Sequence, residues 1–295
     1  MKTLIAAVCV TFVSTLVPAS LVAQDAPAAA AAEPAADDSI RGTVGVDVTT
    51  GYYFRGIRFE DQGLIVQPRY ELACELLQAG DQTPSVEMLF GTWNSFHGGP
   101  TGTDGGNSSW YEADGYVGLT VGLGERWSLA GTYTWYSSPN GAFEVAEEAI
   151  VGISFDDAGL FGESFGGLQP ALSFGFETKG QQDGGANRGI YAQIGIAPEF
   201  ALGSFAGGEL GLSLPFAVGF SLSDYYEGSD GSDHAFGFAD LGIVLSEPLA
   251  FVPSRFGPWT ATVSMHALFL GEMPEEANGG DDFQLIGACG ISTTF

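Results

Sequence analysis

An alternation of bulky and small residues with a period of two is the feature that most constrains the fold of this chain. In segment 127–135, Trp, Leu, Gly, Tyr and Trp occupy the odd positions, while Ser, Ala, Thr and Thr occupy the even ones. Segments 210–220 and 259–269 repeat this pattern. A period of two over this length is typical of β-strands with two different faces. The sequence therefore predicts an all-β fold.

The small face of these strands is a poor exterior for a soluble protein. It consists mostly of Gly, Ala, Ser and Thr, and only 15% of all residues are charged, whereas a soluble surface usually carries about 25–35% charged residues. The pattern fits a membrane barrel better, with the bulky residues facing lipid and the small and polar residues facing an aqueous lumen. Closure of the barrel then pairs every backbone group, as lipid requires.

We therefore predict a transmembrane antiparallel up-and-down β-barrel of the bacterial outer-membrane type, with about twelve strands. Each expected strand is followed by residues that favour turns. The expected strands span residues 43–55, 63–77, 84–96, 109–122, 126–137, 142–155, 168–179, 188–200, 208–222, 234–246, 257–270 and 282–295.

The N-terminus has the composition of an export signal. A basic start is followed by the apolar run 3–17 and by a cleavage point after Ala23, which predicts a signal peptide over residues 1–23. An uncleaved membrane anchor is the alternative. Residues 24–40 are rich in Ala and Pro and predict a disordered linker. The barrel is then expected over residues 41–295.

Charge and the C-terminus indicate the partners. With 36 Asp and Glu against 9 Lys and Arg, the chain cannot bind nucleic acid by neutralising phosphates. The chain ends on Phe295, the last bulky residue of an alternating strand. We associate such a strand with recognition by the barrel-assembly machinery of a Gram-negative-type envelope. We expect outer-membrane lipid, small solutes or cations, and this machinery as partners.

Residues 51–57, GYYFRGI, place a cation directly after three aromatic residues. We expect this segment to be the top of the first strand. On that assignment Tyr52 and Phe54 face lipid at the outer interface, where aromatic rings gather. Arg55 has the opposite parity and turns into the pore mouth, and Gly56 permits the turn into the first loop.

The same segment carries a resemblance to a known family. It is followed by Asp61-Gln62-Gly63, Val66-Gln67, the stretch GTWNS at 91–95, and a Tyr-x-Trp-Tyr strand within 111–155. In these motifs the chain resembles the TorF family of outer-membrane porins. The resemblance covers residues 43–157 well and the rest only in pattern; Arg58-Phe59-Glu60 stands where the family usually has Ser-Gln. It implies a barrel in the outer membrane rather than a particular substrate.

The parity of the strands predicts which charged side chains face the lumen. Carboxylates lining a narrow aqueous passage attract cations and repel anions. The alternative is that these charges only solvate a water-filled interior. We expect Arg69 to contact Asp47 or Glu71, and Glu147 falls on the lipid side, which indicates a bulge or an error of register. The predicted pore-lining residues are Asp47, Arg55, Arg69, Glu71, Glu87, Glu112, Asp114, Glu144 and Glu148.

The leading prediction is thus a porin-like channel for small solutes or ions. A barrel without an open pore, serving a structural or adhesive role, is one alternative. An outer-membrane hydrolase is another, but His97 and His234 fall in or near expected loops. Ser264 and His266 share a face two residues apart, a spacing of about 6.5–7 Å that is too long for a hydrogen bond. No catalytic residue and no cofactor are expected.

An acidic segment and two cysteines raise the questions of metal binding and of a disulfide. The segment 224–234 holds four acids in the order Asp224, Glu227, Asp230 and Asp233, and hard cations take oxygen ligands. Its spacing matches no calcium motif, so a solvated acidic loop is preferred to a metal site. Cys74 and Cys289 are expected on the lipid face with one strand between them, too far apart to form a disulfide.

Overall fold

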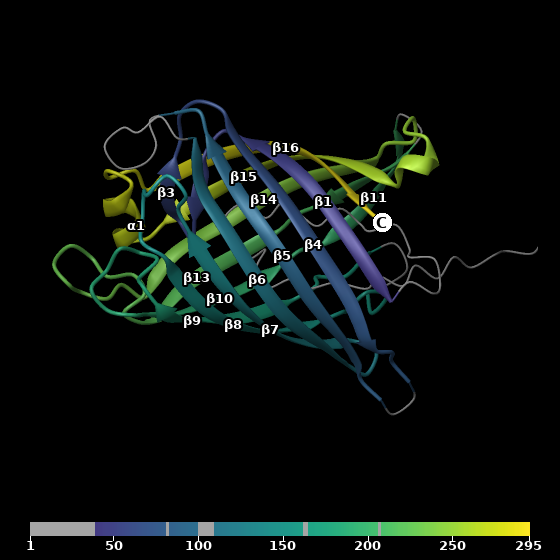
Figure 1. Cartoon of the computed structure of the whole chain (residues 1–295), viewed down its shortest axis with the longest axis horizontal. Coiled ribbons are helices and arrows are strands. Elements are labelled where there is room, and N and C mark those ends of the chain that lie inside the picture. The colour runs from purple at the N-terminus through teal and green to yellow at the C-terminus, as the bar shows by residue number, and fades with distance from the viewer. Residues whose placement is uncertain (1–38, 81–82, 100–108, 162–164, 206–207) are drawn as a thin grey trace, which may run out of the picture.

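The chain forms a closed antiparallel barrel, as predicted. The computed structural model describes residues 39–80, 83–99, 109–161, 165–205 and 208–295. The predicted signal peptide and almost all of the predicted linker lie outside these residues. Within the described ranges, twelve strands form the wall (Figure 1). They are β1 (Ile40–Thr49), β4 (Ile65–Leu77), β5 (Ser85–His97), β6 (Trp110–Leu123), β7 (Trp127–Ser137), β8 (Ala146–Phe155), β9 (Ala171–Lys179), β10 (Ile190–Ile196), β13 (Phe216–Ser223), β14 (Phe236–Pro248), β15 (Trp259–Leu270) and β16 (Phe283–Thr294).

The first and last wall strands close the ring. β1 pairs with β4 on one side and with β16 on the other, where Thr43 lies opposite Thr294. The backbone of Phe295 exchanges two hydrogen bonds with Gly42, so the pairing extends to the last residue. Cys74 and Cys289 lie on either side of β1 and are both free thiols.

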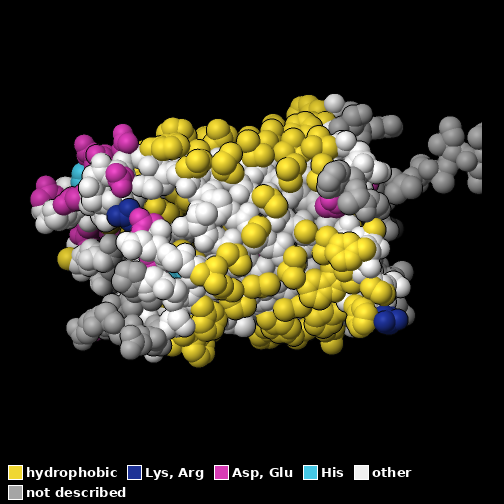
Figure 2. Space-filling model, turned by 90° about the horizontal axis from the view of Figure 1, so that it is seen from above, with side chains coloured by type: hydrophobic (Ala, Val, Ile, Leu, Met, Phe, Trp, Pro, Cys, Tyr) yellow, Lys and Arg dark blue, Asp and Glu magenta, His cyan; other side chains and the backbone are white. Residues whose placement is uncertain are grey.

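The alternation is inverted relative to a soluble protein. On β15 the side chain of Val263 is 58% exposed, whereas its neighbours Thr262 and Ser264 are 6% and 8% exposed. Figure 2 shows apolar side chains along the length of the barrel and most of the visible acids at one end. A bulky exterior and a small, polar interior are what a barrel in lipid requires. Among the described helices, none has the length and apolar character to span a bilayer.

Two wall strands are interrupted by proline. Residues 188–200 and 208–222 were each expected to be one strand, but each is split. β10 is separated from β11 (Glu199–Phe205) at Ala197-Pro198, and β12 (Gly208–Ser213) from β13 at Leu214-Pro215. Proline donates no ladder hydrogen bond, which explains both breaks. β11 and β12 pair with each other and extend from the end opposite helix α1 (Glu272–Ala277) (Figure 1).

The first wall strand ends earlier than expected. The predicted strand 43–55 stops at Thr49, and the chain then forms a separate two-stranded sheet, β2 (Tyr52–Phe54) with β3 (Ile57–Glu60). The Thr49 hydroxyl donates to the carbonyl of Gly51 at 2.9 Å, within the bend. Because this bend breaks the phase of the alternation, the parity of β1 does not apply beyond it. Residues 52–60 are called the inner hairpin below.

Candidate functional site

The inner hairpin is buried inside one end of the barrel. Tyr52, Tyr53 and Phe54 are 0%, 3% and 3% exposed, so the expectation that Tyr52 and Phe54 face lipid is wrong. A two-residue turn, Arg55-Gly56, joins the strands of the hairpin, and both residues have positive φ, 49° and 87°. A tight hairpin turn of the I′ type needs this conformation at both positions.

Aromatic packing connects the inner hairpin to opposite parts of the wall. Tyr52 packs against Trp93 of β5 and Tyr111 of β6, with ring centroids 5.2 and 6.3 Å apart. Tyr53 belongs instead to a buried cluster that includes Phe238 of β14 and Leu268 of β15. The hairpin therefore fills the space between the two walls at this end of the barrel.

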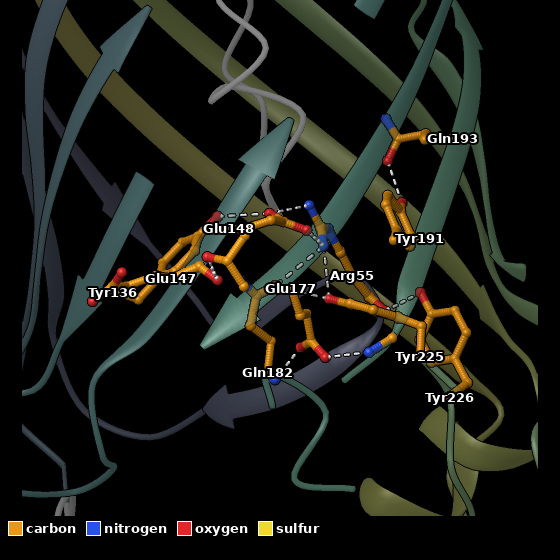
Figure 3. Close-up of polar contacts among 12 residues, drawn as sticks. Arg55, Tyr136, Glu147, Glu148, Glu177, Gln182, Tyr191, Gln193, Tyr225 and Tyr226 are labelled. Atoms are coloured by element: carbon orange, nitrogen blue, oxygen red, sulfur yellow. Dashed lines mark hydrogen bonds and ion pairs between the residues drawn. The ribbon is translucent and has the colours of Figure 1, made fainter. Parts of the chain in front are cut away.

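Arg55 points into the lumen, as expected, but it is fully enclosed there. Its Nη1 and Nη2 donate to the two carboxylate oxygens of Glu148, on β8, at 2.7 and 2.9 Å. Nη1 also donates to Gln182 Oε1 at 3.1 Å and to the Tyr225 hydroxyl at 2.8 Å. Figure 3 shows these contacts converging on the guanidinium from several elements of the wall. Both members of the ion pair are buried, with side chains 2% and 0% exposed.

Aromatic rings complete the surroundings of the guanidinium. Its central carbon lies 3.9 Å from the ring centroid of Tyr191 and 5.1 Å from that of Tyr225, distances at which a cation is attracted to the ring face. Tyr136 donates a hydrogen bond of 3.1 Å to Glu148. Gly175 of β9 leaves room for the pair, because a Cβ there would clash with the Glu148 carboxylate. We call Glu148, Gln182, Tyr191 and Tyr225 the cation cage.

Four further hydrogen bonds hold the inner hairpin, three through its backbone and one through Tyr52. The Tyr226 hydroxyl donates to the carbonyl of Arg55 at 3.0 Å. Asn278, directly after α1, donates to the carbonyl of Gly56 and accepts from the N–H of Arg58, both at 2.8 Å. The hydroxyl of Tyr52 donates to Glu112 Oε2 at 2.8 Å.

The acidic loop 224–233 packs against the loop that carries Gln182. Glu227 accepts hydrogen bonds from the backbone N–H groups of Asn187 and Ala186 at 2.6 and 2.7 Å, and the N–H of Asn187, together with its side chain, holds the pKa of Glu227 below its ordinary value. Burial raises the pKa of Asp183, which accepts from the N–H of Glu227 at 3.0 Å. Among the described residues, no group of three or more His, Cys, Asp or Glu side chains is arranged to hold a metal ion.

The predicted pore-lining residues fall into two groups along the barrel. Arg55, Glu112, Asp114 and Glu148 lie at the level of the inner hairpin and are buried. Further along the wall, Arg69 pairs with Asp47, as one of the two expected contacts, Glu71 accepts from Tyr116 at 3.2 Å, and Glu87 pairs with Arg41. Glu144 was expected in a strand, but it lies outside the strands, before β8, and is exposed.

The expected irregularity at Glu147 is present. The pairing of β8 with β9 shifts register between Glu147 and Glu148. Glu147 accepts from the hydroxyl of Tyr133 at 2.6 Å and from Lys179 at 3.2 Å. These partners satisfy a carboxylate on the outer parity near the end of the strands.

Some residues of the site were not found from the sequence. Gln182, Tyr191 and Tyr225 are ordinary loop or strand residues, and only the fold brings them to Arg55. Ser95 and His97 are two residues apart, yet Ser95 Oγ lies 2.8 Å from His97 Nε2. That spacing was expected to be too long for a hydrogen bond between Ser264 and His266; the Ser95–His97 contact, which was not predicted, forms at a strand end, where the pairing of β5 with β6 is shifted by a bulge. His266 has a carboxylate as its partner: its Nδ1 lies 2.9 Å from Asp240 Oδ2.

A comparison with known proteins finds likeness in structure only. No family model and no curated protein matches the chain. An outer membrane channel from Pseudomonas putida F1 is 12% identical, with a TM-score of 0.49 over 92% of this chain and 100% of that one. The NanC porin is 12% identical (TM-score 0.44, 85% of this chain and 98% of that one). The outer membrane channel DcaP of Acinetobacter baumannii is 10% identical (TM-score 0.39, 90% of this chain and 99% of that one).

Proposed function

We propose that the protein is an outer-membrane channel for small solutes, with a preference for cations, and that the inner hairpin closes it in the conformation described here. The observation that carries this proposal is the closed barrel with an apolar exterior and a charged interior. A barrel of this kind removes all strand edges from lipid. A polar interior is the arrangement found in outer-membrane barrels that enclose a water-filled channel.

The charge of the interior supports a preference for cations. Carboxylates outnumber cations among the charged side chains on the inner parity of the described strands, and such rings raise the local concentration of cations. The inner carboxylates are Asp47, Glu71, Glu87, Glu112, Asp114, Glu148, Glu177 and Asp240, and the inner arginines of the strands are Arg41 and Arg69, to which the turn of the inner hairpin adds Arg55.

The hydrolase alternative has one observation in its favour, the Ser95–His97 pair. Ser95 is 0% exposed, and Tyr52 of the inner hairpin packs against Trp93 and His97 on the same strand. A nucleophile needs access to its substrate and a base oriented by a third group. The buried position of Ser95 favours a packing role, so a channel is the better proposal. The second alternative, a permanently closed barrel, differs from a channel in conductance.

Location and assembly follow from the same architecture. We propose the outer membrane as the site of the protein, since its exposed apolar residues need lipid. We propose that the barrel-assembly machinery recognises β16, whose alternation ends on the exposed Phe295.

The proposal is tested by single-channel recording in a planar bilayer with a KCl gradient. We expect a reversal potential of cation-selective sign, reduced in a Glu71→Gln/Glu87→Gln double variant and unchanged in Glu125→Gln, an exposed residue of a turn. A variant in which a short Gly-Ser turn replaces residues 51–63 should conduct several-fold more than the wild type, because its lumen lacks the inner hairpin. Anion preference would reject the proposed preference for cations, and no conductance in either the wild type or this variant would reject the channel.

A further inference from the structure

Arg55 is presented to the cation cage in the way that a ligand is presented to a site. It lies at the tip of the two-residue turn and has a positive φ of 49°, a backbone conformation that residues other than Gly rarely adopt. Apart from Phe54, whose ring centroid lies 4.9 Å from the guanidinium carbon, the groups around it come from elsewhere in the chain. They belong to β8, to β10, and to the β9–β10 and β13–β14 loops.

The cage has the chemistry that recognises a planar cation. A carboxylate that accepts two parallel N–H bonds matches a guanidinium group, and the face of an aromatic ring stabilises the cation further. The amide oxygen of Gln182 and the hydroxyl of Tyr225 also accept hydrogen bonds from Nη1. Tyr226 and Asn278 already hold the tip of the hairpin through the carbonyls of Arg55 and Gly56. The contacts of the cage with the guanidinium group are therefore additional to those that fix the backbone.

The cage cannot remain empty without cost. With Arg55 gone, the buried carboxylate of Glu148 would keep only the hydroxyl of Tyr136 among the partners described above. An unpaired buried carboxylate strongly favours capture of another cation. The four residues of the cage come from the wall and its loops, and within the cage the Tyr225 hydroxyl also donates to Gln182 Oε1 at 3.1 Å.

We propose that the cation cage is a binding site for solutes that carry a guanidinium group, and that Arg55 is a tethered occupant which such solutes displace. This inference rests on the proposed channel and names its solute class. Displacement of Arg55 removes the ion pair that holds the tip of the inner hairpin. The hairpin then opens in the presence of the solute that the channel admits.

Because Arg55 belongs to the same chain as the cage, it determines the concentration that a free solute needs in order to displace it. A group held on a short segment has an effective concentration on the order of millimolar or higher. A free solute must therefore reach at least that range to compete in the wild type. Removal of Arg55 should strengthen binding of a guanidinium probe by roughly 10-fold or more, since the competitor is gone.

Methylguanidinium chloride is the probe, and the full-length protein in detergent is the sample. The melting temperature is followed for the wild type, Arg55→Ala and Arg55→Ala/Glu148→Gln, with sodium chloride at equal concentration as control. We expect the probe to raise the melting temperature of Arg55→Ala above the sodium control, and to leave that of the double variant at the control value. In the wild type the probe must compete with the tethered Arg55, so a concentration of about tens of millimolar is needed. At that concentration it should speed cleavage by chymotrypsin at residues 52–54, because the hairpin is displaced.

The contrary results are equally specific. If methylguanidinium stabilises Arg55→Ala no more than sodium does, or stabilises the double variant equally, the cage does not bind the cation. If it binds Arg55→Ala but never exposes residues 52–54 in the wild type, Arg55 is a permanent anchor and the tethered-occupant proposal fails. Arg55→Gln replaces Arg55→Ala if the latter does not fold. Loss of conductance with binding retained would reject the channel but not the site.

Discussion

Asn278 joins the end of α1 to the inner hairpin with a single side chain. Its amide group donates to the carbonyl of Gly56 and accepts from the N–H of Arg58, and its own carbonyl accepts from the Arg58 side chain at 3.1 Å. The residue is 1% exposed, so no water replaces these bonds without rearrangement. Asn278 thus stabilises the tip of the hairpin independently of the cation cage.

We predict that Asn278→Ala loosens the hairpin while the barrel remains folded. Two buried backbone groups lose their partners, at a cost of about 1–3 kcal/mol each. The frequency of channel openings in a planar bilayer should rise by about 30-fold or more, since the smallest total cost is about 2 kcal/mol and about 1.4 kcal/mol corresponds to a factor of ten. Glu276→Gln, an exposed change on the same helix, is the matched control. Equal opening frequencies in both variants would show that Asn278 does not hold the hairpin.

Single residues also show why the orientation of the segment GYYFRGI was predicted only in part. The inward direction of Arg55 agrees with the expectation, but the burial of Tyr52 and Phe54 does not. A signal was available: Arg55-Gly56 lies between two short aromatic or apolar runs, which is the pattern of a tight two-residue hairpin. The aromatic residues were assigned to the interface because outer-membrane strands often end there, and that preference is no guide once the chain leaves the wall.

At the scale of elements, the loop over residues 181–189 connects the acidic loop to the cation cage. Glu227 fixes this loop through Ala186 and Asn187, and Gln182 of the same loop reaches Arg55. The other acids of segment 224–233 also accept hydrogen bonds, Asp224 from Ser223, Asp230 from Ser232 and Asp233 from Ser221, so this loop is not an open cluster of carboxylates.

We predict that acid loosens this loop through Glu227. The pKa of Glu227 is lower in the folded protein than its ordinary value, so its contribution to stability is present above that ordinary value of about 4.3 and is lost as the pH falls through the folded pKa. Amide hydrogen exchange at residues 186–187, corrected for its intrinsic pH dependence, should rise below about pH 4. Glu227→Gln should remove this dependence. Asp183, whose pKa is raised by burial, acts in the opposite direction and would remain in that variant.

Elements were predictable where the alternation is unbroken. β7, β14 and β15 agree with the expected ranges within two residues. The prediction of one continuous strand over residues 208–222 is wrong at Pro215, although the sequence itself shows a proline there, which is unfavourable inside a wall strand. The predicted number of about twelve wall strands is nevertheless confirmed, because β12 and β13 both pair with β14 and form one interrupted strand.

At the scale of the whole molecule, the apolar exterior of the barrel indicates that lipid rather than water surrounds the wall. Val263 lies near the middle of β15 on the outer face, and Phe269 lies near one end of the same face, both at least half exposed. In lipid the cost of a charge depends on depth, whereas on a water-exposed surface it would not.

We predict that Val263→Lys destabilises the barrel in lipid vesicles by about 2–4 kcal/mol, and that Phe269→Lys costs about 0–1 kcal/mol beyond its lost packing. Unfolding in denaturant, measured on the vesicle-inserted protein, provides the comparison. Equal effects at the two positions, or none, would argue that this face does not contact lipid.

The sequence alone determined the architecture of the wall, because alternation is a local property: each residue's face is fixed by its parity within a strand. The twelve wall strands, the apolar exterior and the free cysteines follow from that parity, which also narrowed the partner of Arg69 to Asp47 or Glu71; the structure selects Asp47. Only the tertiary structure decided the course of residues 52–60. Whether this segment continues the wall or folds inward depends on Glu148, Tyr191, Tyr225 and Asn278, which lie far away in the chain and meet Arg55 and Gly56 only after the barrel closes.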